Sequence, residues 1–89
     1  MKTLHTSSQF RKDFKLAEKR GKDMRKLQAI LDLLATDTAL PSRCRPHKLS
    51  GDYAGYWECH IEPDWLLIYH IGLQIIELAR TGTHSDMFD

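Results

Sequence analysis

The sequence has few cysteines and no long apolar run. Its two cysteines, Cys44 and Cys59, form neither a Cys-x-x-Cys pair nor a metal-like spacing. No apolar run approaches the roughly 18 residues of a membrane span, and the first residues lack the apolar segment of a signal peptide. We therefore expect a cytoplasmic protein with reduced thiols and no membrane contact.

Internal repeats, low-complexity tracts and linkers are also lacking. At 89 residues, 42% hydrophobic and 28% charged, the composition is ordinary for a soluble globular protein. A domain of this length buries about 60 to 70% of its unfolded surface, which allows a two-layer core but no large internal cavity. We expect a single domain over residues 1–89, with any active site in a shallow surface cleft.

A net charge of only +1 conceals an uneven distribution. Residues 1–48 carry twelve Lys and Arg against five Asp and Glu, whereas residues 49–89 carry one Arg against seven acids. Such a basic half is suited to binding a polyanion. Lys12, Lys15 and Lys19 are candidate RNA-binding residues, although such lysines can also simply solvate a helix face.

Apolar spacing predicts two helices in the first half of the chain. A short edge strand is expected at Lys2–His5. Ser7 or Ser8 then caps a first helix that ends at Gly21, and a second helix runs from about Lys22 to Ala35. The two helices form an αα-hairpin with one apolar side.

After Pro41 the apolar period becomes that of a strand. Close turns separate four predicted strands, at His47–Leu49, Tyr56–Ile61, Trp65–Ile71 and Ile75–Arg80. Close turns favour antiparallel pairing. The predicted fold class is α+β, with two N-terminal helices packed on one face of a small, mostly antiparallel sheet of four to five strands.

Alternation along the strand Tyr56–Ile61 assigns its side chains to two faces. Trp57 and Cys59 share the face that we assign to the core, so His60 points to the open face. Arg80 shares the phase of the apolar residues before it, but it stands at a strand end, where a long side chain can leave the core.

Several motifs resemble one known family. They are Pro46 to Gly51, Gly55-Tyr56, His60 to Tyr69, Arg80 to His84, and Phe88, with a similar helical segment from Asp13 to Met24. Over nearly its whole length the chain resembles the YafQ branch of the RelE superfamily. These proteins are toxins of bacterial type II toxin-antitoxin systems.

The resemblance implies a RelE-like fold and a ribosome-dependent endoribonuclease, an mRNA interferase that cuts messenger RNA in the decoding site. The implied partners are messenger RNA, the 70S ribosome and a small cognate antitoxin with a DNA-binding N-terminal part, and the free toxin is expected to be a monomer. By motif position, the catalytic groups are His47, His60, Asp64 and His84, supported by Arg80 and Phe88. Trp65 is a candidate RNA contact, with a structural role as the alternative.

These residue types suit RNA cleavage without a metal ion or other cofactor. A base must deprotonate the 2′-hydroxyl, a cation or donors must stabilise the phosphorane, and an acid must protonate the 5′-oxygen. Histidine suits both proton transfers, and arginine suits the phosphate. Asp64 could be the base or could orient a histidine. The sequence does not assign the base and acid roles among His47, His60, Asp64 and His84.

Two alternatives stay open. Three histidines and an aspartate could bind zinc, although the intervals between the histidines do not resemble those of zinc ligands. The chain could also be a non-catalytic RNA- or protein-binding module that uses its basic helical half.

One position departs from the family pattern. Trp57 stands where the resemblance leads us to expect an arginine. If that arginine steadies the scissile phosphate in relatives, this chain relies on Arg80 or on its basic helices instead. We expect the Trp57 indole to be largely buried against the helices.

Overall fold

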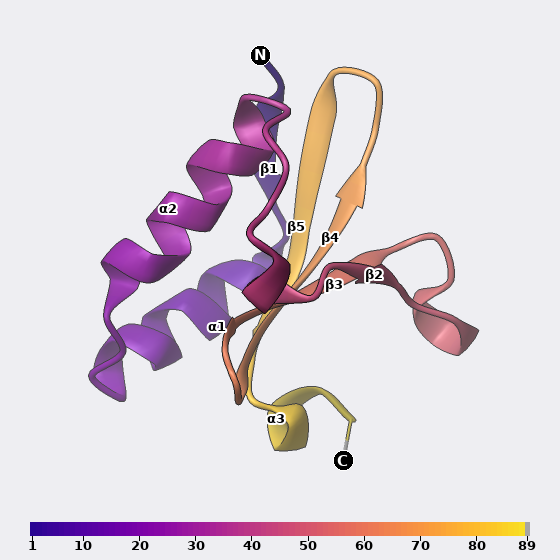
Figure 1. Ribbon diagram of the computed structural model, residues 1–89. Helices are drawn as coiled ribbons and strands as arrows, with labels where there is room; N and C mark the ends of the chain where they lie inside the picture. The colour runs from indigo at the N-terminus through magenta and orange to yellow at the C-terminus, as the bar shows by residue number, and fades with distance from the viewer. Residues whose placement is uncertain (89) are drawn as a thin grey trace.

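The computed structural model describes residues 1–88 and has two layers (Figure 1). One layer is a five-stranded sheet, and the other consists of α1 (Ser8–Lys19) and α2 (Met24–Ala35) on one face of that sheet. We call the opposite face the open face. The strands are β1 (Thr3–Thr6), β2 (His47–Lys48), β3 (Trp57–Glu62), β4 (Trp65–Ile71) and β5 (Ile75–Gly82), and the short helical segments are η1 (Ser42–Cys44), η2 (Gly51–Tyr53) and α3 (His84–Phe88).

The sheet has the strand order β1-β5-β4-β3-β2. β1 runs parallel to β5, from Thr3 opposite Ile75 to Thr6 opposite Leu78. All other neighbouring strands in the described residues pair antiparallel. The prediction of an α+β fold with a mostly antiparallel sheet is confirmed.

Side-chain caps fix the starts of the two long helices. Ser7 Oγ accepts the Phe10 amide at 2.9 Å, and Asp23 Oδ1 accepts the Arg25 amide at 3.1 Å. α1 ends before Gly21, whose φ of +81° is costly for other residues. α2 begins slightly later than predicted, because Asp23 caps it. No helix of residues 1–88 is long and apolar enough to cross a membrane.

The main core lies between the helices and the sheet and includes both cysteines, which are free and buried. Burial raises the pKa of the Cys59 thiol to about 12, so this thiol stays protonated and unreactive. The other buried members are Phe10, Ala17, Leu27, Ile30, Leu31, Leu34, Trp65, Leu67, Tyr69, Ile76 and Leu78.

A smaller apolar cluster lies on the open face. Met87 of α3 packs with Leu66 and Ile68 of β4, and Tyr53 of η2 packs against them. The sequence predicted no helix here, yet α3 lies at the lower end of the sheet in Figure 1. Its position determines where His84 is placed.

The predicted phase of β3 is confirmed. Cys59 is fully buried under the helices, and Trp57 packs against the same core. Trp57 is partly buried there, in agreement with the expected packing against the helix side of the sheet. It lies near the edge of the sheet beside Leu40 and Pro46, and Lys48 Nζ is 5.7 Å from the centroid of its ring.

A bulge in β5 determines the face of the sheet on which the side chain of Arg80 lies. Tyr69 pairs with Leu78 and Ile68 pairs with Arg80, which leaves Ala79 as the extra residue. Arg80 therefore shares the open face with Ile68, and the apolar residues before the bulge stay in the core.

Candidate active site

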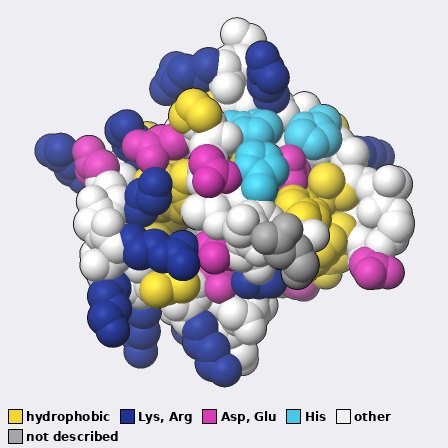
Figure 2. All heavy atoms as spheres, turned by 90° about the horizontal axis from the view of Figure 1, so that it is seen from below, with side chains coloured by type: hydrophobic (Ala, Val, Ile, Leu, Met, Phe, Trp, Pro, Cys, Tyr) yellow, Lys and Arg dark blue, Asp and Glu magenta, His cyan; other side chains and the backbone are white. Residues whose placement is uncertain are grey.

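Three histidines form a row on the open side of the molecule, visible as the cyan group in Figure 2. The ring centroids of His47 and His60 are 6.5 Å apart, and those of His60 and His84 are 5.9 Å apart. They come from β2, β3 and the first residue of α3. The fold thus brings together three predicted site residues that are distant in the sequence.

Asp64, in the turn between β3 and β4, binds His84 twice. Its Oδ1 lies 2.7 Å from His84 Nδ1 and accepts the His84 backbone amide at 3.0 Å. The backbone hydrogen bond, followed by the side-chain one, holds the pKa of Asp64 below its ordinary value. Asp64 therefore stays ionised and fixes the ring of His84, whose Nε2 remains for another partner.

The first turn of α3 is held by its own residues and by α1. The Thr83 amide donates to Asp86 Oδ2 at 3.0 Å, and the Asp86 amide donates to Thr83 Oγ1 at 3.1 Å. This reciprocal pair is a capping box. Arg20, at the end of α1, donates to both Asp86 oxygens at 2.7 and 3.3 Å. The box and the ion pair together fix the backbone that carries His84.

His47 is engaged at both ring nitrogens. Nδ1 lies 2.8 Å from the Arg45 carbonyl oxygen, and Nε2 lies 3.3 Å from Glu58 Oε1. Glu58 is on the open face, as the phase of β3 predicted, but it is buried there. Both neighbouring groups are hydrogen-bond acceptors, so they hold the ring of His47 in place and leave it less available for proton transfer than its two neighbours.

His60, at the centre of the row, is partly buried. Its Nδ1 is fully buried and has no hydrogen-bond partner among residues 1–88. Unpaired buried polar atoms are uncommon in folded proteins. The unpaired buried nitrogen therefore distinguishes His60 from the other two histidines of the row.

Arg80 is fixed by Asp13, a buried residue of α1. Its Nε and Nη2 donate to the two Asp13 oxygens at 3.0 and 3.2 Å, and the Thr81 amide donates to Asp13 Oδ2 at 3.2 Å. The hydrogen bond to Asp13 raises the pKa of Arg80, with a smaller contribution from Tyr53. Arg80 thus offers a permanent, oriented positive charge.

Sequence reasoning missed Asp13. It stands in α1 among charged residues and gives no local signal of its partner, which lies 67 residues further along the chain.

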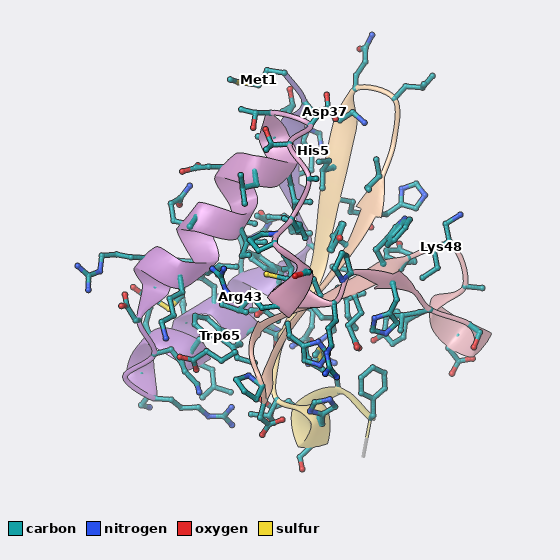
Figure 3. The ribbon with its side chains drawn as sticks, viewed as in Figure 1. Met1, His5, Asp37, Arg43, Lys48 and Trp65 are labelled. Carbon is teal, nitrogen blue, oxygen red and sulfur yellow. The ribbon has the colours of Figure 1, made fainter. Side chains whose placement is uncertain are left out.

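The two predicted aromatic residues differ in exposure. Phe88 is 49% exposed and packs edge-on against Tyr53, with ring centroids 6.4 Å apart. Trp65, labelled in Figure 3, is only 1% exposed, and its indole N–H donates to Thr81 Oγ1 at 2.9 Å. A buried indole cannot stack on a base, so the predicted RNA contact of Trp65 is corrected to a structural role.

The three lysines predicted to bind RNA, Lys12, Lys15 and Lys19, are exposed along α1. None of them forms an ion pair with another residue of the described range. Their charges are therefore available to a polyanion.

The zinc alternative requires a set of ligands. Among residues 1–88, no group of three His, Cys, Asp or Glu side chains is arranged to hold a metal ion. The histidine row is instead an extended array in which His84 is hydrogen-bonded to Asp64 and His47 Nε2 lies 3.3 Å from Glu58 Oε1.

Comparison with known proteins identifies relatives. Residues 2–89 match the family described as a bacterial toxin of type II toxin-antitoxin system, YafQ. The mRNA interferase toxin YafQ of Escherichia coli strain K12 is 46% identical over 83 residues, covering 92% of this chain and 90% of that protein. In the crystal structure of the E. coli DinJ-YafQ complex, the matching chain has a TM-score of 0.93, 41% identity and full coverage of both chains. The crystal structure of a metal-bound toxin from Helicobacter pylori gives a TM-score of 0.92 and 39% identity, covering 99% of this chain and 100% of that chain.

The Arg20–Asp86 pair predicts a pH-dependent stability. Folding lowers the pKa of Asp86 from 3.8 to about 2, chiefly through the hydrogen bond from Arg20. Its stabilisation is therefore complete above pH 3.8 and is lost as the pH falls toward about 2. Asp86→Asn should lower the free energy of unfolding by on the order of 1 kcal/mol at neutral pH, and this loss should shrink in acid.

Urea unfolding of the parent and of Asp86→Asn, at neutral pH and in acid, measures the loss of unfolding free energy under each condition. Asp52→Asn, which removes an exposed carboxylate of η2, is the matched control and should have little effect. A loss that stays constant through the acid range would show that the charge of Asp86 is not what stabilises α3.

Proposed function

The chain belongs to the YafQ family of bacterial toxins of type II toxin-antitoxin systems, and from that premise we propose that it is an endoribonuclease that cuts messenger RNA in the ribosomal decoding site. The observation that carries the proposal is the histidine row, with Asp64 bonded to His84. Histidines exchange protons near neutral pH, and here they lie on the same face as an oriented arginine. These are the groups that cleavage of an RNA phosphodiester requires.

His84 and His60 are proposed to carry the two proton transfers. Their ring centroids are 5.9 Å apart, so one phosphodiester can contact both rings. One histidine takes the proton of the 2′-hydroxyl as that oxygen attacks phosphorus, and the other gives a proton to the departing 5′-oxygen. His47, with both nitrogens engaged, is proposed to help position the substrate.

Asp64 is proposed to orient His84 rather than to act as the base. A carboxylate with a lowered pKa is a poor proton acceptor at neutral pH, but it holds an imidazole firmly. Arg80 is proposed to stabilise the phosphorane through the part of its guanidinium that Asp13 leaves free. Phe88, half-exposed beside Tyr53, can stack on a base.

We propose that the reaction proceeds without a metal ion. The histidines supply acid and base, and Arg80 supplies the cation, so the three chemical requirements are met by side chains. Because the related toxin from Helicobacter pylori has a metal-bound structure, the cleavage assay described below includes a chelator of transition metals.

The ribosome is proposed to complete the site. The centre of the site holds one oriented arginine and few other phosphate-binding groups, which is little to align a flexible RNA strand. Alignment of reacting groups supplies a large part of catalysis. A decoding site that holds the messenger would provide the alignment that this small surface lacks.

Replacement of the central histidines should abolish toxicity. His84→Ala should lower messenger cleavage by about 10²- to 10⁴-fold, and His60→Ala and His47→Ala should have smaller effects. Growth after induction is the readout, and circular dichroism checks that each variant folds. His5→Ala, which removes an exposed histidine of β1, is the matched control. Full growth arrest by His84→Ala at equal expression would exclude His84 from the reaction.

Ribosome dependence predicts a difference between two substrates. Purified protein should cut a messenger quickly during translation and slowly as naked RNA, because only the ribosome aligns the strand. Primer extension on the same messenger measures both rates. A chelator of transition metals that leaves Mg²⁺ bound to the ribosome should not change them. Equal rates on both substrates would indicate a freestanding ribonuclease, and inhibition by the chelator would indicate a metal enzyme.

A cognate antitoxin is the proposed protein partner. The uneven charge of the chain offers complementary surfaces, and the DinJ-YafQ complex provides a precedent in a relative. The product of the adjacent reading frame should co-purify with this chain, and the segment that inhibits it should fold on binding. Isolated toxin should bind operator DNA only weakly and in a salt-sensitive way. A toxin that stays active and uncomplexed beside that product would refute the pairing.

A further inference from the structure

We propose that Arg43 and Arg45 form a second phosphate-binding subsite beside the histidine row, which holds an RNA phosphate adjacent to the one that is cut. The inference rests on the proposed ribonuclease function and specifies how the site grips its substrate. The subsite is a shallow surface hollow. Its lining residues are Arg43, Arg45, His60, Ile61, Glu62 and Pro63.

The hollow exists because β2 is short. β2 pairs with Trp57 and Glu58 of β3, so among residues 1–88 the outer edge of β3 has no neighbouring strand from Cys59 onward. η1, which contains Arg43, and Arg45, which follows it, occupy this space and line the hollow together with His60. An RNA strand that crosses the histidine row toward this edge of the sheet therefore meets both arginines.

The hollow is positively charged. Glu62 is the only carboxylate among its lining residues, and Lys26 and Lys22 neutralise it at 2.8 and 3.3 Å. These hydrogen bonds hold the pKa of Glu62 below its ordinary value, so Glu62 stays ionised and its charge is balanced by the two lysines. Arg43 and Arg45 are exposed and form no ion pair with any residue of the described range.

Two unpaired guanidinium groups suit a phosphodiester. The planar fork of arginine matches two phosphate oxygens, and a guanidinium with no carboxylate bound to it has all of its N–H groups available. Arg43, labelled in Figure 3, also borders the surface of α2. Figure 2 shows further Lys and Arg side chains, in dark blue, on the same face as the histidines.

His60 links the hollow to the row. It lines the hollow, its ring neighbours those of His47 and His84, and its buried Nδ1 has no partner among residues 1–88. Arg45 is tied to the row as well, since its carbonyl oxygen lies 2.8 Å from His47 Nδ1. The arginines and the proposed proton-transfer groups thus belong to one continuous surface.

The proposal assigns this phosphate to the messenger. A phosphate of ribosomal RNA would be recognised by the same chemistry, so the binding measurements distinguish the two sources. The test is the double variant Arg43→Gln/Arg45→Gln, which keeps the Arg45 carbonyl that holds His47. The matched control is Arg11→Gln, because Arg11 is an exposed arginine of α1 bonded to Thr6. Circular dichroism verifies that both variants fold.

Two binding arms use an inactive His84→Gln background and fluorescence anisotropy. One arm measures the affinity for a short single-stranded RNA without ribosomes, and the other the affinity for ribosomes with an empty decoding site. The double variant should bind about tenfold more weakly in at least one arm. The slope of its log binding constant against log salt concentration should also become less steep, by about 0.7 for each phosphate that is no longer neutralised. Weaker binding in the first arm identifies the messenger as the source, and weaker binding confined to the second identifies ribosomal RNA.

A third arm measures cleavage with the native His84. The double variant should show a raised KM and a kcat within about twofold of the parent, since the arginines bind but do not transfer protons. Unchanged affinity in both binding arms, or an equally weakened affinity in Arg11→Gln, would overturn the subsite. The subsite would also be overturned if the double variant bound RNA as well as the parent does but no longer bound the antitoxin. That result would assign the hollow to an acidic segment of a protein partner.

Failure of the two proposals can be told apart. A parent protein that cuts messenger, together with a double variant that binds and cuts equally well, overturns the subsite alone. A parent protein that neither binds nor cuts RNA overturns the proposed function and the subsite together.

Discussion

The carboxylate of Asp13 joins the helix layer to the end of the sheet where the site lies. β1 stops at Thr6, so beyond Leu78 the outer edge of β5 has no strand beside it. Residues at the start of α1 cover this edge: Ser7 Oγ donates to the Ala79 carbonyl at 2.7 Å, and Asp13 accepts three N–H groups from Arg80 and Thr81. Removing the arginine from a buried carboxylate lowers the free energy of unfolding by about 3 to 5 kcal/mol. The same hydrogen bonds of Asp13 therefore hold α1 against the sheet and orient Arg80.

The eight residues that follow Leu78 convert a core strand into a candidate active site. The bulge at Ala79 moves Arg80 to the open face, and Thr81 returns to the core, where it accepts the Trp65 indole N–H. The capping box of Thr83 and Asp86 then starts α3. Each device is local, but together they give the cation and the last histidine of the row their positions.

The periodic parts of this chain were predictable from sequence, and the irregular parts were not. β4 has the predicted bounds Trp65–Ile71, because turn residues frame it on both sides. The same alternation could not reveal the bulge in β5, since one extra residue leaves no trace in an apolar pattern. α3 is too short to show a helical period, although its Thr83-x-x-Asp86 pattern is a readable cap. The family motif identified the histidines from sequence. It could not identify Asp13 as the partner of Arg80, because the two residues lie 67 positions apart in the chain.

The order of strands has a consequence for how the protein is made. β5 is the last strand in the sequence, yet it lies between β1 and β4 in the sheet. A ribosome delivers the chain from its N-terminus, so a nascent chain exposes β1 and one edge of β4 until residues 75–82 emerge. Arg80 and His84 leave the exit tunnel after His47, His60 and Asp64. A nascent chain that lacks residues 75–88 therefore holds neither Arg80 nor His84, so the order of strands makes the candidate site depend on this segment.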